Sequence, residues 1–565
     1  MTAVTEPRIK PSEPSLLRSG SLTLWMFGFC LIAGAITLNW PSTPSYDPWS
    51  WLIWGREILH GHLTIAGGSS WKPLPVLFTT VFALFGSAQP YLWLIVARAG
   101  ALMASLMAAK LTARIVLRMV AQRRPAGWLA QLPPWQRAAA LAPVVLAAAL
   151  ALLGSGFTPT YPVPMMLGYS EGFTFGLALI AVERAWDGHH RQAFAIGLLP
   201  CLDRPELWFL WMPYGLWLIW RERRGWRGWR GWRGWRAWLP VLTVLGGIAL
   251  MLALWVVPQV LGGRSATGLV THARHNHSVH SAVNSAFPFW TELSHVIWPL
   301  VVERVEAAAL LLIAVTAVLL VRARRRLGGW REAVRANGPQ ATAALAGVVG
   351  FGWWLGISIE TQIGFAGNTR YTIFGVLLVY IAGASAYAWA AIALAQLAGR
   401  LPLARAAAAR RLGATGALMA LVFLFVPGWF AHRLPSVSSI RVALRYQAQL
   451  REGYAGLIKR AGGPAKLLAC GSVMTDNYEV TMLAWYLDVP IPRVQALPHT
   501  LETAQGPNVV VQAGGTSDTP DDLGPSPVQM GFWEEGWLAA NGSHYTIRQQ
   551  YPVTLFTDCS THSTT

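Results

Sequence analysis

The sequence predicts a mainly α-helical, polytopic membrane protein that ends in a small α/β domain outside the cytoplasm. The first observation is composition, because the 565-residue chain is 54% hydrophobic and only 13% charged, whereas a soluble domain carries about 25% charged residues. The second is that long apolar runs recur from residue 21 to about residue 431, as is typical of membrane-spanning helices. Beyond this point the composition becomes that of a soluble domain.

The net charge of +19 is distributed unevenly. From Arg433 to the end the chain holds 9 Lys/Arg and 11 Asp/Glu, so this tail carries about −2 and the rest about +21. A pI near 10.4 is also typical of nucleic-acid-binding proteins. Here the basic residues lie in short loops between apolar runs, as the positive-inside rule describes. We therefore interpret the charge as membrane topology and expect no nucleic-acid partner.

Basic clusters mark the side that faces the cytoplasm, at residues 8–18, 110–137, 221–236, 322–335 and 400–411. We place the shorter segment 183–191 on the same side. An uncleaved first span is favoured over a signal peptide, because the first run is long for an h-region and no Ala-x-Ala site follows it. About eleven spans are then expected, near residues 21–39, 91–112, 138–155, 170–186, 193–203, 206–220, 239–258, 296–321, 341–358, 371–397 and 413–431.

This topology divides the chain into three parts on a bacterial plasma membrane. Residues 1–20 form a cytoplasmic tail, residues 21–432 a transmembrane domain, and residues 433–565 a soluble extracytoplasmic domain. Within the transmembrane domain, residues 40–90 form one large outer loop with juxtamembrane helices.

The run 73–87 is interpreted as a helix lying on the outer face. It is short for a hydrocarbon core of about 30 Å, and a span there would place residues 110–137 outside. A second surface helix is expected over 48–60, with its tryptophans at the membrane interface and Asp47 as its N-cap. The span 193–203 is also short and ends in "CLDRPE", a charged break that needs a cavity or surrounding protein.

The tail is expected to alternate helices and strands. "SSIRVALRYQAQLREGYAGLIKRAG" and "NYEVTMLAWYLD" have helical periodicity, whereas "AKLLACG", "NVVVQAG" and "YTIRQQYPVTLFTDC" are interpreted as strands. Cys470 and Cys559 lie in this tail and pair if it is outside the cytoplasm. Two unpaired thiols are an equally weighted alternative.

Two further motifs receive minor roles. The GWR repeat over 221–238 is interpreted as a topology anchor in preference to a site for anionic lipids. The stretch "THARHNHSVHS" has spacing that could bind a metal, but no Cys or acid completes the set. A metal site is therefore the less favoured interpretation of its histidines, which are His272, His275, His277 and His280.

Ionisable residues gather on the predicted outer side, and such membrane-edge charges are functional candidates. A mixture of acids and bases suits a reaction in which a carboxylate takes a proton while cations hold a phosphate leaving group. A purely structural network of salt bridges would contain the same mixture of acids and bases in the sequence. The residues are Asp47, Arg56, Glu57, Lys72, Arg98, Glu171, Asp203, Arg204, Glu206, Glu360 and Arg370.

The first outer loop, "YDPWSWLIWGREILHG", resembles that of the GT-C superfamily of membrane glycosyltransferases. The closest pattern is that of protein O-mannosyltransferases and lipid A aminoarabinose transferases, where an Asp follows the first span and an Arg-Glu pair lies nine and ten residues later. The resemblance covers roughly residues 20 to 400 in order and spacing. The matching motifs are Asp47 with Arg56 and Glu57, "WKPLP" with Lys72, Arg98, "GYSEGF" with Glu171, "LDRPE" with Asp203 and Arg204, and "GNTRYTIF" with Arg370 and Tyr371.

The resemblance implies an inverting hexosyl- or pentosyltransferase that moves a sugar from a polyprenyl-phosphate donor to a cell-envelope glycan, lipid or protein. Asp47 would be the general base. Cations would bind the donor phosphate, and further residues would contact substrate or serve structure. The phosphate-binding set is Arg370, Arg204, Lys72 and Arg98, and the second set is Glu171, Tyr371, Asp203 and Glu57.

The chain departs from the family pattern in one place. Pro48 stands where relatives often carry a second acid, so the pattern assigns no metal site, although a divalent cation stays open as a cofactor. Extracytoplasmic C-terminal domains occur among GT-C enzymes that build actinobacterial cell walls, and the Ala-, Arg- and Trp-rich composition resembles such a source.

Three structural alternatives accompany these assignments. Glu57 could be an ordinary helix residue, a role favoured for it and for Arg56. Glu171 and Arg98 could form a buried pair that positions spans, and Arg370 could be an interface anchor. For the whole chain, the alternatives are a transporter or flippase of a lipid-linked sugar, for which no inverted repeat is seen, or a non-catalytic assembly protein.

Overall fold

A computed structural model of the chain describes residues 20–122, 124–125, 127–159, 161–224, 238–263, 274, 281–301, 303–398, 436–496, 509–513 and 545–559. Four predicted features lie outside these residues. They are the tail before residue 20, most of the GWR repeat, all four histidines of the His-rich stretch and the span 413–431.

The described residues up to Ala398 are mainly helical. The short turns η1, η2, η3, η6, η8 and η9 cover Thr37–Asn39, Ala83–Ala88, Pro205–Leu207, Ala282–Asn284, Trp298–Leu300 and Thr369–Thr372, and the π-helical turn η7 covers Glu292–Ile297. The α-helices are α2 Gly20–Ile36, α3 Tyr46–Leu59, α4 Pro73–Phe82, α5 Gln89–Ala121, α6 Pro134–Gly156, α7 Pro162–Met166, α8 Glu171–Trp186, α9 His190–Cys201, α10 Trp208–Arg224, α11 Leu239–Leu261, α13 Pro288–Thr291, α14 Glu303–Leu327, α15 Trp330–Ala336, α16 Gly338–Gln362 and α17 Ile373–Ala398.

Seven helices among the described residues are long and apolar enough to cross a membrane. The molecule is therefore a membrane-embedded, mainly α-helical protein. Ten of the eleven predicted spans fall on described residues and coincide with helices, but α8, α9 and α10 have 16, 12 and 17 residues, shorter than the roughly 20 that a span needs. The span predicted from residue 296 begins later, at Glu303, because Glu292–Ile297 forms a π-helical turn and Trp298–Leu300 a 3₁₀ turn before α14.

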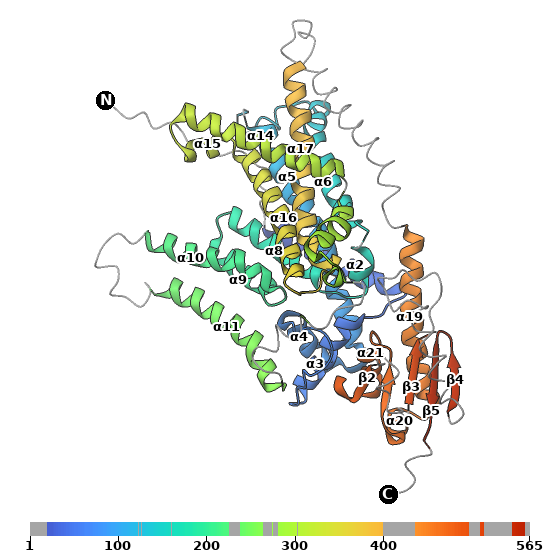
Figure 1. Cartoon of the computed structure of the whole chain (residues 1–565). Helices are drawn as coiled ribbons and strands as arrows, with labels where there is room; N and C mark the ends of the chain where they lie inside the picture. The colour runs from blue at the N-terminus through green and yellow to red at the C-terminus, as the bar shows by residue number, and fades with distance from the viewer. Residues whose placement is uncertain are drawn as a thin grey trace.

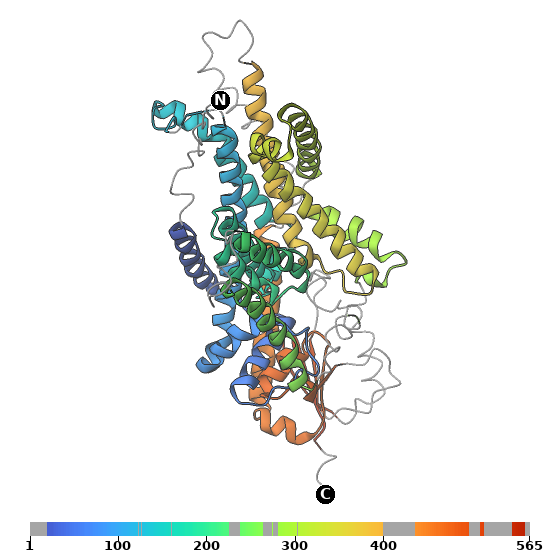
Figure 2. The ribbon, with the colours of Figure 1, turned by 90° about the vertical axis from the view of Figure 1, so that its left-hand side faces the viewer.

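Helices α5 and α17 lie inside the helical bundle, with α2, α6, α8, α14 and α16 packed around them (Figure 1, Figure 2). Helices α5 and α8 approach closely because small residues meet there. A Cβ on Gly172 would lie 2.6 Å from Ala101 Cα, and a Cβ on Gly100 would lie 2.4 Å from Phe173 Cα. Small residues permit such close helix contacts in membranes. This contact fixes the beginning of α8, where Glu171 lies.

The outer loop folds into a compact unit in which α3 and α4 pack against each other. The hydroxyl of Thr79 donates to the backbone oxygen of Trp51 at 2.6 Å. The side-chain amide of Gln89 donates to the backbone oxygen of Leu52 at 3.0 Å. A Cβ on Gly55 would lie 2.6 Å from the Thr79 carbonyl carbon, so only glycine allows this approach.

Two expectations about this loop are wrong. Helix α3 begins at Tyr46, with Ser45 as its N-cap, so Asp47 lies inside the first turn and is not the cap. The tryptophans of α3 are also not at a membrane interface. Trp49, Trp51 and Trp54 are at most 2% exposed, because the outer helices and the C-terminal domain cover them. Their rings lie against Trp485, Trp93 and Trp71, respectively.

The C-terminal domain contains helices and a five-stranded sheet in the order β2-β1-β3-β5-β4. Strands β1, β2 and β3 are parallel neighbours, whereas β5 pairs antiparallel with β3 and β4. The turn η11 covers Ile491–Arg493. The other elements are α19 Val437–Arg460, α20 Pro464–Cys470, β1 Val473–Thr475, α21 Val480–Leu487, β2 Val494–Ala496, β3 Val509–Ala513, β4 Thr546–Gln550 and β5 Val553–Thr557.

One predicted strand of this domain is wrong. "AKLLACG" forms helix α20, and the strand begins three residues later at Val473. The helix starts with Pro464 directly after Gly463, whose φ is +92°, and proline is well suited to the first turn of a helix. Cys470 and Cys559 form a disulfide, which resolves the alternatives left open for these two residues.

A buried network of charges joins the ends of α5 and α8 that lie away from the outer loop. Glu183 forms ion pairs with Lys110 at 2.8 Å and with Arg114 at 3.0 Å. Asp187 pairs with Arg114 and Arg184. The predicted topology places residues 110–137 and 183–191 on one side of the membrane, and these pairs hold the two segments together.

Candidate active site

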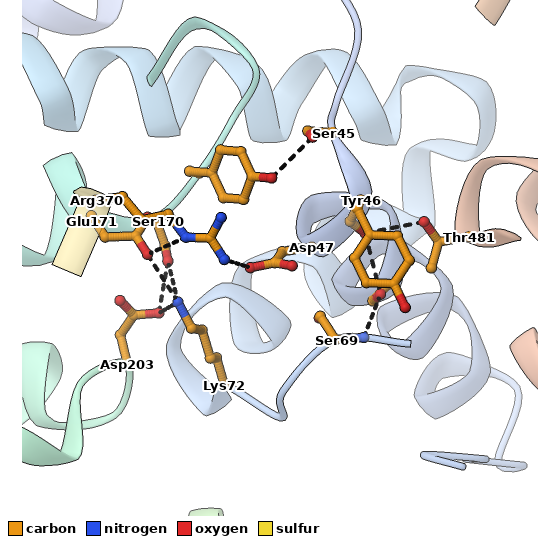
Figure 3. Close-up of polar contacts among 12 residues, drawn as sticks. Ser45, Tyr46, Asp47, Ser69, Lys72, Ser170, Glu171, Asp203, Arg370 and Thr481 are labelled. Carbon is orange, nitrogen blue, oxygen red and sulfur yellow. Dashed lines mark hydrogen bonds and ion pairs between the residues drawn. The ribbon is translucent and has the colours of Figure 1, made fainter. Parts of the chain in front are cut away.

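Six charged side chains from five separate segments meet near the outer loop. Figure 3 shows all of them except Arg204. Asp47 comes from the first turn of α3, and Lys72 immediately precedes α4. Glu171 opens α8. Asp203 and Arg204 lie between α9 and the turn η3, and Arg370 lies in η9 before α17. Segments more than 300 residues apart in the chain therefore build one site.

Glu171 is the centre of this cluster. It is fully buried, and its Oε1 forms an ion pair with Arg204. The same oxygen lies 3.4 Å from Lys72 Nζ and 3.3 Å from Arg370 Nε. The alternative in which Glu171 pairs with Arg98 is not seen, since the cations that contact this carboxylate are Lys72, Arg204 and Arg370.

Asp203 holds Lys72 from a second direction. Its Oδ1 lies 3.6 Å from Lys72 Nζ and accepts a hydrogen bond from Ser170 Oγ at 2.8 Å. Its Oδ2 accepts from Thr174 Oγ1 at 2.6 Å. Lys72 itself donates to Ser170 Oγ at 3.3 Å and lies 5.2 Å from the centroid of the Trp51 ring. Both oxygens of Asp203 and the Lys72 ammonium are therefore fixed in place.

Asp47 and Arg370 form the part of the cluster that is most open to solvent. Arg370 Nη2 donates to Asp47 Oδ2 at 2.8 Å, and the two side chains are 18% and 12% exposed. The guanidinium lies 4.2 Å from the ring centroid of Tyr169, whose hydroxyl is 3.1 Å from Ser45 Oγ. Asp47, predicted as the base, and Arg370, predicted as a phosphate ligand, are thus bound to each other.

Arg204 links the cluster to Tyr371 and Glu206. Its guanidinium carbon lies 3.8 Å from the Tyr371 ring centroid, which is a cation–π contact. Its Nη1 is 3.5 Å from Glu206 Oε1. Tyr371, predicted to contact substrate or serve structure, therefore orients Arg204 in this structure.

Arg98 and Glu57 are not part of this cluster. Arg98 donates from Nε and Nη2 to the backbone oxygen of Met166 and from Nη1 to that of Thr37. Nη2 also donates to Ser42 Oγ at 2.9 Å. These bonds occupy its guanidinium with protein acceptors and connect α2, α5 and α7.

Glu57 and its neighbour Arg56 have separate partners. Glu57 accepts from the backbone N–H of Thr64 at 2.8 Å, and burial raises the pKa of its carboxyl. Arg56 pairs with Asp488 at 2.7 Å. Both have the structural surroundings that the sequence favoured for them.

Three residues that complete the site were not predicted from the sequence. Tyr169, Ser170 and Thr174 all come from the turn and first helical turn of "GYSEGFT". A run of hydroxyl groups next to an acid at the beginning of an apolar helix was the available signal, because such groups need buried partners.

The site holds polar atoms that this arrangement does not use. Among the described residues, Glu171 Oε2, Arg204 Nε and Arg370 Nε are buried without a hydrogen-bond partner. Buried polar groups normally have partners from protein, water or ligand. Arg370 Nε has its ion-pair contact with Glu171 Oε1 at 3.3 Å but no hydrogen bond, so this atom and Arg204 Nε are guanidinium donors suited to an anionic ligand.

Comparison with known proteins adds one distant likeness. No protein-family model and no curated sequence matches the chain. Among solved structures, the chain is similar to the crystal structure of ArnT from Cupriavidus metallidurans in the apo state, with 14% sequence identity and a TM-score of 0.44 over 95% of this chain and 98% of that chain. Because both values are low, the site is interpreted from its own residues alone.

Proposed function

We propose that the protein is a membrane glycosyltransferase of the GT-C type that transfers a sugar from a polyprenyl-phosphate donor to a cell-envelope acceptor. One observation carries this proposal: Asp47 lies in direct contact with Arg370, within a cluster that also holds Lys72 and Arg204. A carboxylate next to several cations at a membrane edge provides a base for an acceptor hydroxyl and ligands for a phosphate leaving group.

The proposed reaction is a single displacement. Asp47 takes the proton from the acceptor hydroxyl while the acceptor oxygen bonds to the anomeric carbon of the donor sugar. The bond between this carbon and the phosphate oxygen breaks, and its electron pair stays on the polyprenyl phosphate. The leaving group gains negative charge, which Arg370 and Arg204 stabilise. One displacement from the opposite face inverts the anomeric centre.

Charge balance indicates how the donor enters. The described cluster pairs three cations with four carboxylates, Asp47, Glu171, Asp203 and Glu206, so a phosphate must displace an acid from a cation. Among the described ion pairs, Asp47, Asp203 and Glu206 each have a single cation. Asp47 is displaced most easily, because its partner Arg370 is 18% exposed, whereas Lys72 and Arg204, the partners of the other two acids, are 7% and 5% exposed. A phosphate on Arg370 would thus also free Asp47 to act as a base.

The proposed steps use protein groups alone. Among the residues that the structure describes, no group of three or more His, Cys, Asp or Glu is placed to hold a metal ion. Lys72 is the third cation and, since Glu171 and Asp203 hold it, its role is to offset the negative charge of these two acids near the phosphate.

The proposed location is the outer face of a bacterial plasma membrane. The Cys470–Cys559 disulfide supports this side, since disulfides persist outside the cytoplasm. The site lies at the same end of the molecule as the C-terminal domain (Figure 1). A polyprenyl donor would reach it from the lipid bilayer, and an envelope glycan, lipid or protein would reach it from outside.

The test is sugar transfer by the purified protein from synthetic polyprenyl-phosphate sugars, with Asp47→Asn measured alongside. We expect the variant to lose about 10²- to 10⁴-fold in kcat, the usual contribution of a general base. The control is Glu222→Gln, which changes an exposed pair with Arg191 far from the site. Equal activity of Asp47→Asn would refute the base assignment, and no transfer by the wild type from any donor would favour a transporter.

A further inference from the structure

The C-terminal domain contacts the helix that carries Asp47. We propose that this domain positions the Asp47 carboxylate, acting through α21 and α19 on residues 42–56. The inference rests on the proposed function for its catalytic meaning, but the mechanical contact is independent of it. In both views the orange and red C-terminal elements lie beside the blue outer loop (Figure 1, Figure 2).

Helix α21 packs along α3 with aromatic and charged side chains. Trp49 lies 5.5 Å from Trp485 and 6.0 Å from Tyr486, measured between ring centroids. Arg56 pairs with Asp488 at 2.7 Å, and its guanidinium lies 4.8 Å from the Trp485 ring centroid. Aromatic pairs of this kind contribute about 0.5–1.5 kcal/mol beyond their buried area.

A hydrogen bond ties α21 to the residue just before Asp47. Thr481 Oγ1 donates to the backbone oxygen of Tyr46 at 3.1 Å (Figure 3), and Thr481 is fully buried. The ring of Tyr46 lies 6.3 Å from that of Tyr478 in an edge-on arrangement. The first turn of α3 therefore has direct contacts from the C-terminal domain.

Helix α19 reaches the chain on the other side of Asp47. Arg451 Nη1 donates to the backbone oxygen of Ser42 at 2.8 Å. Leu167 packs in a small buried cluster with Ile440 and Leu444 of α19, and its backbone oxygen accepts the N–H of Ser45 at 3.0 Å. The domain thus contacts residues on both sides of Asp47, at Ser42 and Tyr46 before it and at Trp49 and Arg56 after it.

The transmembrane domain binds the Asp47 side chain through Arg370 and the N-cap Ser45 through Leu167 and Tyr169, but its contacts with the backbone inside α3 lie further along the helix. Thr79 and Gln89 bind the backbone oxygens of Trp51 and Leu52, one turn later. Displacing a reacting group by about 1 Å can cost about 10²-fold in rate. The first turn of α3 is therefore where loss of the C-terminal contacts would affect catalysis, while Lys72, Arg204 and Arg370 stay in place.

The experiment uses the full-length protein with two variants and a control. Trp485→Ala removes the aromatic contact, and Thr481→Val removes the hydrogen bond to Tyr46 while keeping the shape of the side chain. Ile547→Ala changes an exposed residue of β4 on the same domain. Hydrogen–deuterium exchange is measured over residues 42–56, and kcat and the donor KM are measured for sugar transfer.

We expect faster exchange over 42–56 and a loss of kcat of about 10- to 100-fold in both variants, with the donor KM unchanged. The pH profile of the remaining activity should keep its shape, since Asp47 is still the base and only the fraction of molecules in which it is correctly positioned falls. Ile547→Ala should match the wild type in every measurement.

Two results would overturn the inference. Unchanged exchange over 42–56 in both variants would show that the domain does not hold this segment. Faster exchange with wild-type kcat would show that the contact does not position the base. If the wild type transfers no sugar, the proposed function fails, and the exchange data alone then decide whether the domain holds the Asp47 segment.

Discussion

Glu171 is fully buried and lies within ion-pair distance of Lys72, Arg204 and Arg370. A single carboxylate that holds three cations orients all of them for a ligand. Removing one partner of a buried pair costs about 3–5 kcal/mol, because a charge stays buried without compensation. Each of these cations keeps a second carboxylate, so the lower end of this range applies here.

We predict that Glu171→Gln lowers the free energy of unfolding by about 3 kcal/mol and abolishes transfer. Thermal unfolding in detergent, followed by tryptophan fluorescence, measures the first effect. The matched control is Glu222→Gln, because the exposed Arg191–Glu222 pair contributes only about 0–1 kcal/mol. Equal losses in the two variants would contradict the central role of Glu171.

Arg98 gives a second prediction at this scale, since the structure surrounds it with protein acceptors. Arg98→Gln leaves the backbone oxygens of Met166 and Thr37 without their donors, and each buried unsatisfied group costs about 1–3 kcal/mol. We expect a lower unfolding temperature with an unchanged donor KM. A raised donor KM in protein of wild-type stability would instead restore the phosphate-binding role that the sequence pattern implied.

Residue types and order in the sequence identified most of the site, but not its pairing. Asp47, Lys72, Glu171, Asp203, Arg204 and Arg370 were all chosen as membrane-edge charges, and the structure brings them together. Which acid meets which cation depends on helix rotation and on the close contact of Gly172 with α5. For this reason the sequence left a Glu171–Arg98 pair open as an alternative, and Ser170 and Thr174 were overlooked.

At the scale of elements, the sequence predicted where helices lie better than it predicted what packs against them. Ten predicted spans fall on described helices, because apolar periodicity is a strong signal. The tryptophans of α3 were expected at a lipid interface, but α21 and α4 bury them. Helix α20 was taken for a strand, since a mostly apolar run of seven residues suits either structure until flanking residues decide. The burial of the tryptophans depends on helices distant in sequence, whereas the α20 error depends on residues directly beside the run.

The beginning of α21 carries a buried acid that makes the C-terminal domain sensitive to pH. Burial, with Asp476 nearby, raises the pKa of Glu479 from 4.5 to about 8. The folded domain then keeps a proton that the unfolded chain releases, so stability falls as pH rises from about 4.5 through about 8. Above about pH 8 the folded domain bears the full cost of ionising the buried Glu479 carboxyl, and below about pH 4.5 it bears none.

We predict that Glu479→Gln flattens this dependence and stabilises the domain at alkaline pH. The measurement is the unfolding temperature of the full-length protein across this pH window. The control is Glu452→Gln on the exposed face of α19, which should keep the slope of the wild type. A wild-type slope in Glu479→Gln would show that another group titrates.

At the scale of the whole molecule, two charge networks lie at opposite ends of α8. Glu171 opens the helix and Glu183 lies near its end, twelve positions later, which corresponds to about 18 Å along the axis at 1.5 Å per residue. The network at Glu183 belongs to the predicted cytoplasmic side. The network at Glu171 adjoins the outer loop and the C-terminal domain. The charge pattern predicts that these two networks lie on opposite sides of the membrane.

This arrangement predicts opposite accessibility for two exposed positions. Single cysteines would replace His189, after α8, and Ile547, in β4. The native cysteines do not interfere, because Cys30 and Cys201 are buried and Cys470 is paired with Cys559. In intact cells a membrane-impermeant maleimide should label Ile547→Cys and leave His189→Cys unlabelled until the cells are permeabilised. Labelling of His189→Cys in intact cells would invert the topology and move the proposed site to the cytoplasmic face, where a donor on the outer leaflet could not reach it.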